Sequence, residues 1–367
     1  MTLDDLPTPC LVLDKGILQR NLDAMAAALA RHNVPLRPHL KTAKSIDVAR
    51  MATKGQPGFI TVSTLAEAEY FVGYRITDIL LAAGITPQKL DRVAALNRFG
   101  ANVMVITDDL DMAGSIALQN TPPRTLIEVD TGEHRGGISP DGPELLEIAK
   151  RLGPALAGVM THAGHSYAGR TVAEMAAIAE AERAGIVRAA ERLRAAGFRA
   201  DIVSMGSSPT ALHAAHLDGV TEVRAGVYMF GDLFQAEILT HGLDDIAVTV
   251  LTSVIGRRQA EGKILVDAGG MALSKDRSTQ TAPKDYGFGL VLDAAGRRSL
   301  GDAIVQTAYQ EHGIIACDPA HPIDLPIGGK LRIAPNHTCM TVAAHDRYHV
   351  VDGSDDVIAI WPRINGW

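Results

Sequence analysis

Lys41, in the segment Arg37–Ser45, is a residue of this chain that could bond covalently to a carbonyl compound. It follows a short strand-like stretch and precedes a predicted helix, as a residue at the mouth of a barrel strand does. Partial burial there disfavours the ammonium form of a lysine, and the neutral amine can form a Schiff base with an aldehyde or ketone. Most lysines are exposed surface residues, so the surroundings of Lys41 must support this role.

Two later segments combine glycine with small or hydroxyl-bearing residues. They are Gly206–Thr210 and Arg224–Tyr228, and they follow the last two strands of the predicted barrel. Loops at these places are the usual phosphate site of such barrels, because glycine exposes backbone N–H groups to an anion. Ser207 and Thr210 would add hydroxyl donors, and Gly226 would permit close approach of the backbone. The alternative is that both segments are ordinary tight turns.

A reactive lysine and a phosphate cradle match the two ends of pyridoxal phosphate. The aldehyde would bond Lys41, the phosphate would bind the glycine-rich loops, and a ring would pack on the pyridine face. His162, in the segment Thr161–Gly164, is in position for that packing. A histidine at a strand end is also commonly a hydrogen-bonded core residue. The sequence therefore predicts pyridoxal phosphate as the cofactor.

His337 and Cys339 lie two residues apart after the predicted strand 331–333. If this segment stays extended, both side chains point to one face. Imidazole nitrogen and thiolate sulfur suit zinc, and two protein ligands would leave positions open for water or substrate. A chance pairing is the alternative, because one histidine and one cysteine are a small ligand set. Nearby His345, Asp346 and His349 are candidates for orienting His337 or for exposed turns.

Alternating strands and helices must position these residues. Eight short apolar runs, most of them separated by helical patterns, predict a closed parallel (β/α)8 barrel. The predicted barrel strands are 36–40, 59–62, 78–81, 103–106, 125–129, 156–161, 202–204 and 222–225, and the clearest helix is 171–196.

After residue 230 the pattern changes to β-rich segments separated by glycine, proline and acidic turns, which predicts an antiparallel β domain. The predicted strands of this part are 246–255, 263–266, 330–333, 348–352 and 357–360. We expect the barrel domain to comprise residues 11–238 and the β-rich domain, with the metal site, to comprise residues 1–10 and 239–367.

The composition favours a small-molecule ligand. The net charge is −7 and no run of lysine or arginine forms a basic stripe, which argues against nucleic acid as a partner. No uncharged apolar run is long enough to span a bilayer, and the acidic first residues do not resemble a signal peptide. The three cysteines show no CxxC spacing and cannot all pair, which indicates a reducing compartment, and the cytoplasm fits best.

Several motifs together resemble the fold-type III pyridoxal phosphate enzymes, and more closely the branch that contains D-serine dehydratase and D-threo-3-hydroxyaspartate dehydratase. The similarity runs over nearly the whole chain. The motifs are 37–45, 161–164, 206–210, 222–228, 267–269, 310–313 and 335–339.

This resemblance implies an alanine racemase-like barrel joined to a β domain, in a homodimer. It implies that Lys41 is the Schiff-base lysine and that His162 stacks on the cofactor. It further implies that Arg135 lies near the phenolic oxygen of the cofactor and Tyr167 near its pyridine nitrogen. Tyr228 ends the motif that carries Gly226 and is expected to bind the cofactor too. In the dehydratase branch a matching His-x-Cys pair binds zinc, and manganese is the alternative metal.

The expected reaction is the elimination of water from a D-3-hydroxy amino acid, which gives a 2-oxo acid and ammonia. A Lewis-acidic metal would lower the cost of breaking the C–O bond. D-Serine and D-threo-3-hydroxyaspartate are the leading substrates. One alternative is a D-threonine aldolase-type lyase that gives glycine and an aldehyde. Others are a non-catalytic protein that binds pyridoxal phosphate and a racemase, which would need a second base opposite Lys41.

Overall fold

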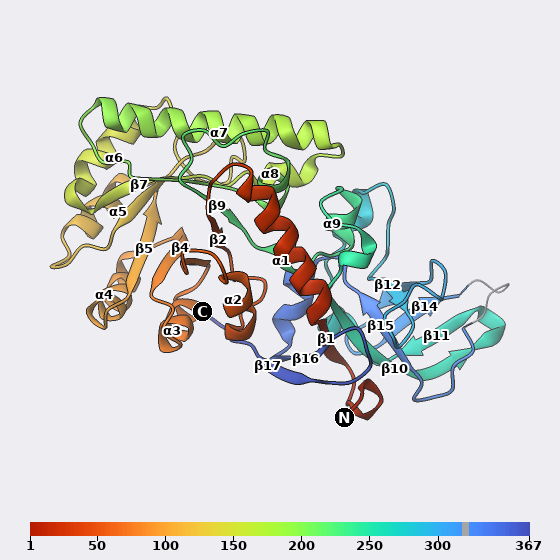
Figure 1. The fold of residues 1–367 in the computed structure, drawn as a ribbon. Coiled ribbons are helices and arrows are strands. Elements are labelled where there is room, and N and C mark those ends of the chain that lie inside the picture. Colours follow the sequence, from red (N-terminus) through yellow and green to blue (C-terminus); the bar gives the residue numbers. More distant parts are fainter. Residues whose placement is uncertain (318–322) are drawn as a thin grey trace. The chain divides into compact units, whose positions relative to one another are not determined.

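The computed structural model describes residues 1–317 and 323–367. Their contacts divide the chain into two compact units. The barrel unit comprises Ala24–Gly226 and Ile364–Trp367, and the β unit comprises Met1–Asp23 and Val227–Arg363. Figure 1 colours both units along the chain. The boundaries at residues 11 and 238 that we expect from the sequence stay a prediction.

Eight parallel strands form the sheet of the barrel unit, in the order β2-β9-β8-β7-β6-β5-β4-β3. A parallel bridge between His39 and Thr61 joins the first strand of this order to the last, which closes the sheet. The predicted barrel is therefore confirmed. Its strands are β2 (Leu36–Pro38), β3 (Ile60–Val62), β4 (Asp78–Gly84), β5 (Asn102–Thr107), β6 (Thr125–Glu128), β7 (Leu156–Met160), β8 (Ile202–Met205) and β9 (Glu222–Ala225).

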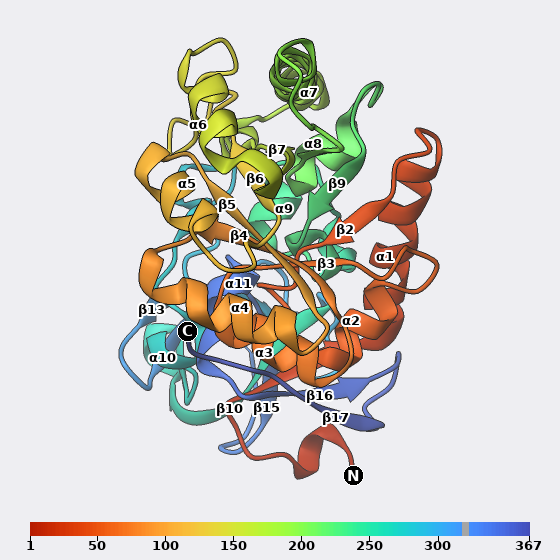
Figure 2. The ribbon, with the colours of Figure 1, turned by 90° about the vertical axis from the view of Figure 1, so that its left-hand side faces the viewer.

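One helix or more separates each pair of consecutive strands, and Figure 2 shows several of these helices beside the strands that they connect. The longest is α7, where Thr171 accepts a hydrogen bond from the backbone N–H of Glu174 and begins the helix as a capping box. The helices are α2 (Ile46–Ala52), α3 (Leu65–Gly73), α4 (Leu90–Arg98), α5 (Leu110–Ala117), α6 (Glu144–Leu152), α7 (Val172–Ala195) and α8 (Ser208–His213), and α1 (Lys15–Ala30) precedes β2.

Apolar and ionic side chains both fill the core of the barrel unit. On β2 and β9, the Nε of buried Arg37 donates to both carboxylate oxygens of Glu222, at 2.9 Å each. Glu222 also accepts a hydrogen bond of 2.7 Å from Ser204 on β8. This pairing is what makes buried charges tolerable in a protein interior. The apolar cluster consists of Leu80, Met104, Ile106, Leu126, Ala157 and Met160.

The β unit contains a nine-stranded sheet, in the order β11-β14-β13-β12-β15-β10-β1-β16-β17. A further pairing of β11 with β10 closes six of these strands into an antiparallel barrel. The strands are β1 (Cys10–Asp14), β10 (Val248–Arg258), β11 (Lys263–Val266), β12 (Leu290–Leu292), β13 (Ile304–Ala308), β14 (Gly313–Ala316), β15 (Lys330–Ala334), β16 (Arg347–Val351) and β17 (Ala359–Pro362), and the short helices are α9 (Leu233–Glu237), α10 (Gly270–Leu273) and α11 (Thr338–Thr341).

Strand β1 and helix α9 both lie in the segment expected for the barrel domain, and both belong to the β unit. Val12 pairs with Thr249 of β10 on one side and with His349 of β16 on the other. The pairing with β10 is antiparallel, whereas that with β16 is parallel. The partners of β1 lie more than 200 residues away in the chain, so no local pattern shows which sheet it joins.

None of the helices in the described residues has the length and apolar composition that crossing a bilayer requires.

Candidate functional site

Lys41 lies directly after β2, at the end of the strand where parallel barrels place functional residues. Its side chain is exposed, whereas the neighbouring Leu40 and Thr42 are buried. The partial burial that the sequence predicted for Lys41 is therefore wrong. The reason is local, because the loop turns the side chains of Leu40 and Thr42 into the core and leaves the one between them facing outward.

The ring of His162 is held in its neutral form. Burial lowers the pKa of His162 to about 3, with the charge of Lys41 as the next largest cause and those of Arg224 and Arg135 adding to it. The backbone C=O of Gly206 lies 2.9 Å from Nδ1 and accepts its hydrogen. His162 is thus a fixed, uncharged ring close to the amine of Lys41.

Positive charge gathers around this histidine. Burial lowers the pKa of His39, and the charges of Lys41 and Arg224 lower it further. Arg224 is buried, and its guanidinium donates to the backbone C=O of Thr161, next to His162. These cations suit an anionic ligand, although the carboxylates of Glu128, Glu182 and Glu222 balance part of the charge of Arg224.

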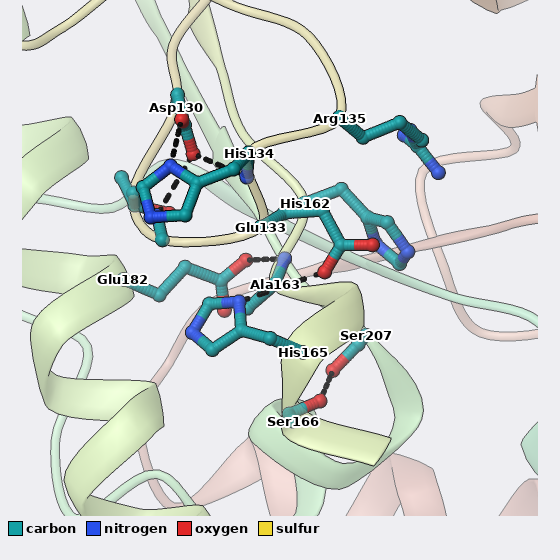
Figure 3. Close-up of polar contacts among 12 residues, drawn as sticks. Asp130, Glu133, His134, Arg135, His162, Ala163, His165, Ser166, Glu182 and Ser207 are labelled. Atoms are coloured by element: carbon teal, nitrogen blue, oxygen red, sulfur yellow. Dashed lines mark hydrogen bonds and ion pairs between the residues drawn. The ribbon is translucent and has the colours of Figure 1, made fainter. Parts of the chain in front are cut away.

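Arg135 lies in the loop after β6, and 59% of its side chain is exposed. Its guanidinium is 3.8 Å from the carboxylate of Glu128 at the end of β6. The start of this loop is held by Asp130, which accepts hydrogen bonds from the backbone N–H groups of Gly132 and His134. Figure 3 shows Arg135 extending away from these contacts.

Tyr167 lies in a 3-10 turn, Gly164–Ala168, that follows β7. Two glycines allow this turn and the loop after β6 to interlock. A Cβ on Gly164 would lie 2.4 Å from the Glu133 carboxylate, and one on Gly132 would lie 3.1 Å from the His165 ring. Glu133 and His165 approach to 3.6 Å, as Figure 3 shows. The loops that carry Arg135 and Tyr167 are therefore packed against each other.

The loop after β8 begins α8 with a capping box, in which the hydroxyls of Ser207 and Thr210 lie 3.0 Å apart. Both residues are buried, and Ser207 also contacts the hydroxyl of Ser166 at 2.8 Å. Gly226 approaches His39, whose backbone oxygen would lie 2.8 Å from an added Cβ. A role of these residues in binding phosphate stays a prediction.

Tyr228 belongs to the β unit, in the 3-10 turn Val227–Met229, and its side chain is fully buried. Burial raises the pKa of its phenol, so the hydroxyl stays protonated. Its predicted contact with a cofactor stays untested.

His337 and Cys339 lie at the start of α11 in the β unit. The segment is not extended as the sequence suggested, because Thr338 begins a helical turn immediately after His337. The turn nevertheless brings the two side chains together. Burial opposes the charged form of His337, but hydrogen bonds to Asp276 and Cys339 outweigh it and raise the pKa of His337 to about 11.

Two aspartates hold this pair. Asp276 lies 3.0 Å from Nδ1 of His337, which leaves the other ring nitrogen for Cys339 or a metal. Asp232 is buried and accepts a 3.0 Å hydrogen bond from the backbone N–H of Thr338, the residue between His337 and Cys339. A second oxygen of Asp232 caps α9.

The donor set of imidazole, thiol and a nearby carboxylate suits a borderline-soft divalent metal. Within residues 1–317 and 323–367 no group of three or more such side chains is arranged to hold an ion. His345 and His349 contact the backbone oxygens of Ala272 and Leu11.

Sequence reasoning missed Asp232, Asp276 and Glu182. The two aspartates meet His337 and Thr338 only through the fold, since 61 and 106 residues separate the partners. Glu182 did leave a signal. It lies in the buried stripe of α7, where every other member except Gly185 is apolar, namely Met175, Ala179, Ile186, Ala189, Ala190 and Leu193.

Two family models match the chain. The model of the alanine racemase N-terminal domain matches residues 13–234, and that of the serine dehydratase domain matches residues 247–351. The chain is 44% identical to D-threo-3-hydroxyaspartate dehydratase of a Delftia species, over 100% of this chain and 99% of that protein. It is 29% identical to D-serine dehydratase of Dictyostelium discoideum, over 100% of this chain and 98% of the other.

The solved structure of the Delftia enzyme superposes on this chain with a TM-score of 0.96 and 42% identity, and covers 100% of both chains. Solved variants of that enzyme include one with a histidine replaced by alanine and one with a cysteine, two residues further on, replaced by alanine. The cysteine variant is in the metal-free form.

Proposed function

Because this chain belongs to the family that joins an alanine racemase N-terminal domain to a serine dehydratase domain, we propose that it is a pyridoxal phosphate- and metal-dependent dehydratase of D-3-hydroxy amino acids. As an ammonia-lyase it eliminates water and releases a 2-oxo acid and ammonia. D-threo-3-Hydroxyaspartate and D-serine are the first substrates to test, since dehydratases of both are similar to this chain over its whole length.

The neighbourhood of Lys41 and His162 is the observation that carries this proposal. An accessible amine lies close enough to a neutral, hydrogen-bonded imidazole for its charge to lower the pKa of that ring. An uncharged ring can pack on an aromatic cofactor without losing the solvation of a charge. The surrounding cations suit the negative charges of pyridoxal phosphate.

Pyridoxal phosphate, when bound, withdraws electrons from the α-carbon of an amino acid. In our proposal Nζ of Lys41 would hold the cofactor at its aldehyde group and would serve as the acceptor of the α-proton. His162 would pack on the ring, Arg135 would lie by the phenolic oxygen and Tyr167 by the pyridine nitrogen. The phosphate group would be bound by Ser207, Thr210, Gly226 and Tyr228.

His337 and Cys339 are the proposed ligands of a divalent metal, with zinc first and manganese as the alternative. The same residue types at the same spacing were replaced in the Delftia enzyme, and the cysteine variant there is metal-free. A bound metal supplies a Lewis acid that makes the β-hydroxyl a better leaving group. Asp276 would orient His337 through Nδ1.

Product analysis tests the proposal. The purified protein with pyridoxal phosphate and zinc is incubated with D-serine, D-threonine and D-threo-3-hydroxyaspartate, and ammonia, 2-oxo acid and glycine are measured together. Equal amounts of ammonia and 2-oxo acid are expected. Glycine with an aldehyde would mean an aldolase, and a protein that binds the cofactor without turnover of any of these would be a non-catalytic binder. Either result contradicts the proposed function.

We further infer a homodimer in the cytoplasm. Cys10, Cys317 and Cys339 form no disulfide bond with one another, which supports a reducing compartment. Light scattering at micromolar concentration tests the dimer, and a mass of one chain would contradict it.

A further inference from the structure

Glu182 is a buried carboxylate that the proposed reaction leaves without a role. It projects from α7, and its side chain is fully buried. One oxygen, Oε1, accepts hydrogen bonds of 3.0 Å from the backbone N–H groups of both Ala163 and Gly206. Figure 3 shows the carboxylate facing Ala163. A single oxygen thus joins the loop after β7 to the loop after β8.

Both bonded residues adjoin groups that we assign to the cofactor. Ala163 follows His162, and Gly206 precedes Ser207. Gly206 also accepts the Nδ1 hydrogen of His162 through its C=O, at 2.9 Å. Glu182 therefore bonds Gly206, whose C=O orients the imidazole of His162, and Ala163, which follows His162 in the chain.

The backbone at Gly206 is tightly constrained. Its φ is +131°, in the region that favours glycine, and an added Cβ would lie 2.3 Å from the backbone oxygen of Arg224. The backbone at this point passes tightly against β9. Displacing it would move the carbonyl oxygen on which the ring orientation of His162 depends.

The placement of Glu182 is unfavourable for stability taken by itself. Burial raises the pKa of the carboxyl, and the Thr210 hydroxyl, the Gly206 N–H and the charge of Arg224 only partly offset this effect. Its second oxygen, Oε2, is buried as well. Burying such a group costs free energy of folding. The benefit of Glu182 must therefore come from aligning the two loops that it bonds.

We propose that Glu182 is a positioning residue, which holds His162 and the Ser207–Thr210 loop in register so that both engage the cofactor. The inference rests on the proposed function, since it presumes that pyridoxal phosphate binds here. What matters is the reach of the side chain and its acceptor oxygen, because the two bonded groups are neutral backbone amides.

Three substitutions separate reach from charge. Glu182→Gln keeps the length and an acceptor oxygen, so the dissociation constant of pyridoxal phosphate should stay within about threefold of wild type. Glu182→Asp keeps the charge but is one methylene shorter, and Glu182→Ala removes the group. Both should weaken binding about 10- to 100-fold, the effect of losing hydrogen bonds to a buried acceptor. Exposed Glu191 on the same helix provides the control, and Glu191→Ala should leave binding unchanged.

Dissociation constants come from equilibrium dialysis of the holoenzyme, with the visible absorbance of the bound cofactor as readout. A result in which Asp binds as wild type and Gln does not would show that charge matters and would overturn the inference. If Glu182→Ala does not fold, the Gln and Asp variants still decide. A wild-type protein that takes up no pyridoxal phosphate contradicts the proposed function itself, whereas normal binding by all the variants contradicts only the role of Glu182.

A double-mutant cycle separates positioning from general stability. If Glu182 acts partly through His162, then Glu182→Asp should change the cofactor affinity by a smaller factor in the His162→Ala background than in wild type, because only the Ser207–Thr210 loop is then left to position. Independent effects would multiply instead. Multiplying fold-changes in the double variant would contradict a positioning role.

Discussion

At the scale of single residues, the barrel unit pairs one exposed amine with one neutral ring. Lys41 is accessible because its neighbours Leu40 and Thr42 face the core. His162 is uncharged because burial and nearby cations disfavour its protonated form. The sequence identifies both residues, since each lies in a recognisable motif at a strand end. The place of Glu182 in the apolar stripe of α7 marks it as unusual, but nothing in that pattern points to the two distant loops that it bonds.

Lys41→Ala should abolish both activity and the visible absorbance of a covalently bound cofactor. The substitution removes the only atom that we assign to the bond, while the exposed position predicts a change in folding stability within about 0.5 kcal/mol. Absorption spectra of the purified variant check this expectation, with Lys44→Ala as a neighbouring control. A yellow, active Lys41→Ala variant would refute the assignment of the Schiff base.

The low pKa of His162 predicts that the folded protein loses stability in acid. Its pKa is about 3 in the folded protein and near 6.5 when unfolded, so the unfolded state takes up a proton first. The stability that the neutral ring contributes is complete above pH 6.5 and is lost as the pH falls toward 3. Urea unfolding at pH 7.5 and pH 5 should show this fall, and His162→Gln should reduce it. An equal fall in the variant would assign the acid sensitivity to other groups, such as His39.

At the scale of elements, α11 and α9 form the framework of the proposed metal site. The sequence identifies His337 and Cys339 from their spacing but wrongly treats the segment as extended. The helical turn depends on Asp232, whose carboxylate bonds the N–H of Thr338 and caps α9 at the same time. A contact across 106 residues leaves no local pattern in a sequence.

Asp232→Ala should weaken metal binding about 10- to 100-fold without removing a ligand, which is the usual effect of losing an outer partner. Cys339→Ala should lose the metal altogether while both variants retain pyridoxal phosphate. Zinc affinity measured by competition with a chromophoric chelator separates the two effects. Zinc binding by Cys339→Ala that equals wild type would show that Cys339 is not a ligand.

At the scale of the whole molecule, local patterns encode the parallel barrel better than they encode the β unit. Each barrel strand lies next to its own helix, so the alternation can be recognised along the sequence. In the β unit the strands β12, β13 and β14 were not predicted, although β13 pairs with both of its neighbours in the chain. They are only three to five residues long, and a bulge between Val305 and Thr307 interrupts the alternation of side chains along β13. Strand β1 lies within the residues expected for the barrel domain, but its partners β10 and β16 follow it by more than 230 residues, so no local pattern shows which sheet it joins.

A cysteine placed opposite Cys10 tests the pairing of β1. Cys10 faces Leu251 across the antiparallel pair β1–β10, and both belong to one buried cluster. Leu251→Cys should therefore form a disulfide with Cys10 on mild oxidation, detected as a linked peptide by mass spectrometry. Val250→Cys, whose side chain points to the opposite face of the sheet, is the matched control. Equal cross-linking of both variants would contradict the register.

The place of β1 between β10 and β16 has a consequence for synthesis on the ribosome. Leu11–Leu13 is translated early, yet neither flanking strand exists until more than 230 further residues have been added. Throughout that interval this apolar segment has two unpaired strand edges, which can pair with incorrect segments or with other chains. We therefore expect Leu11–Leu13 to need protection by chaperones while the chain is being synthesised. These few residues should determine how strongly folding depends on chaperones.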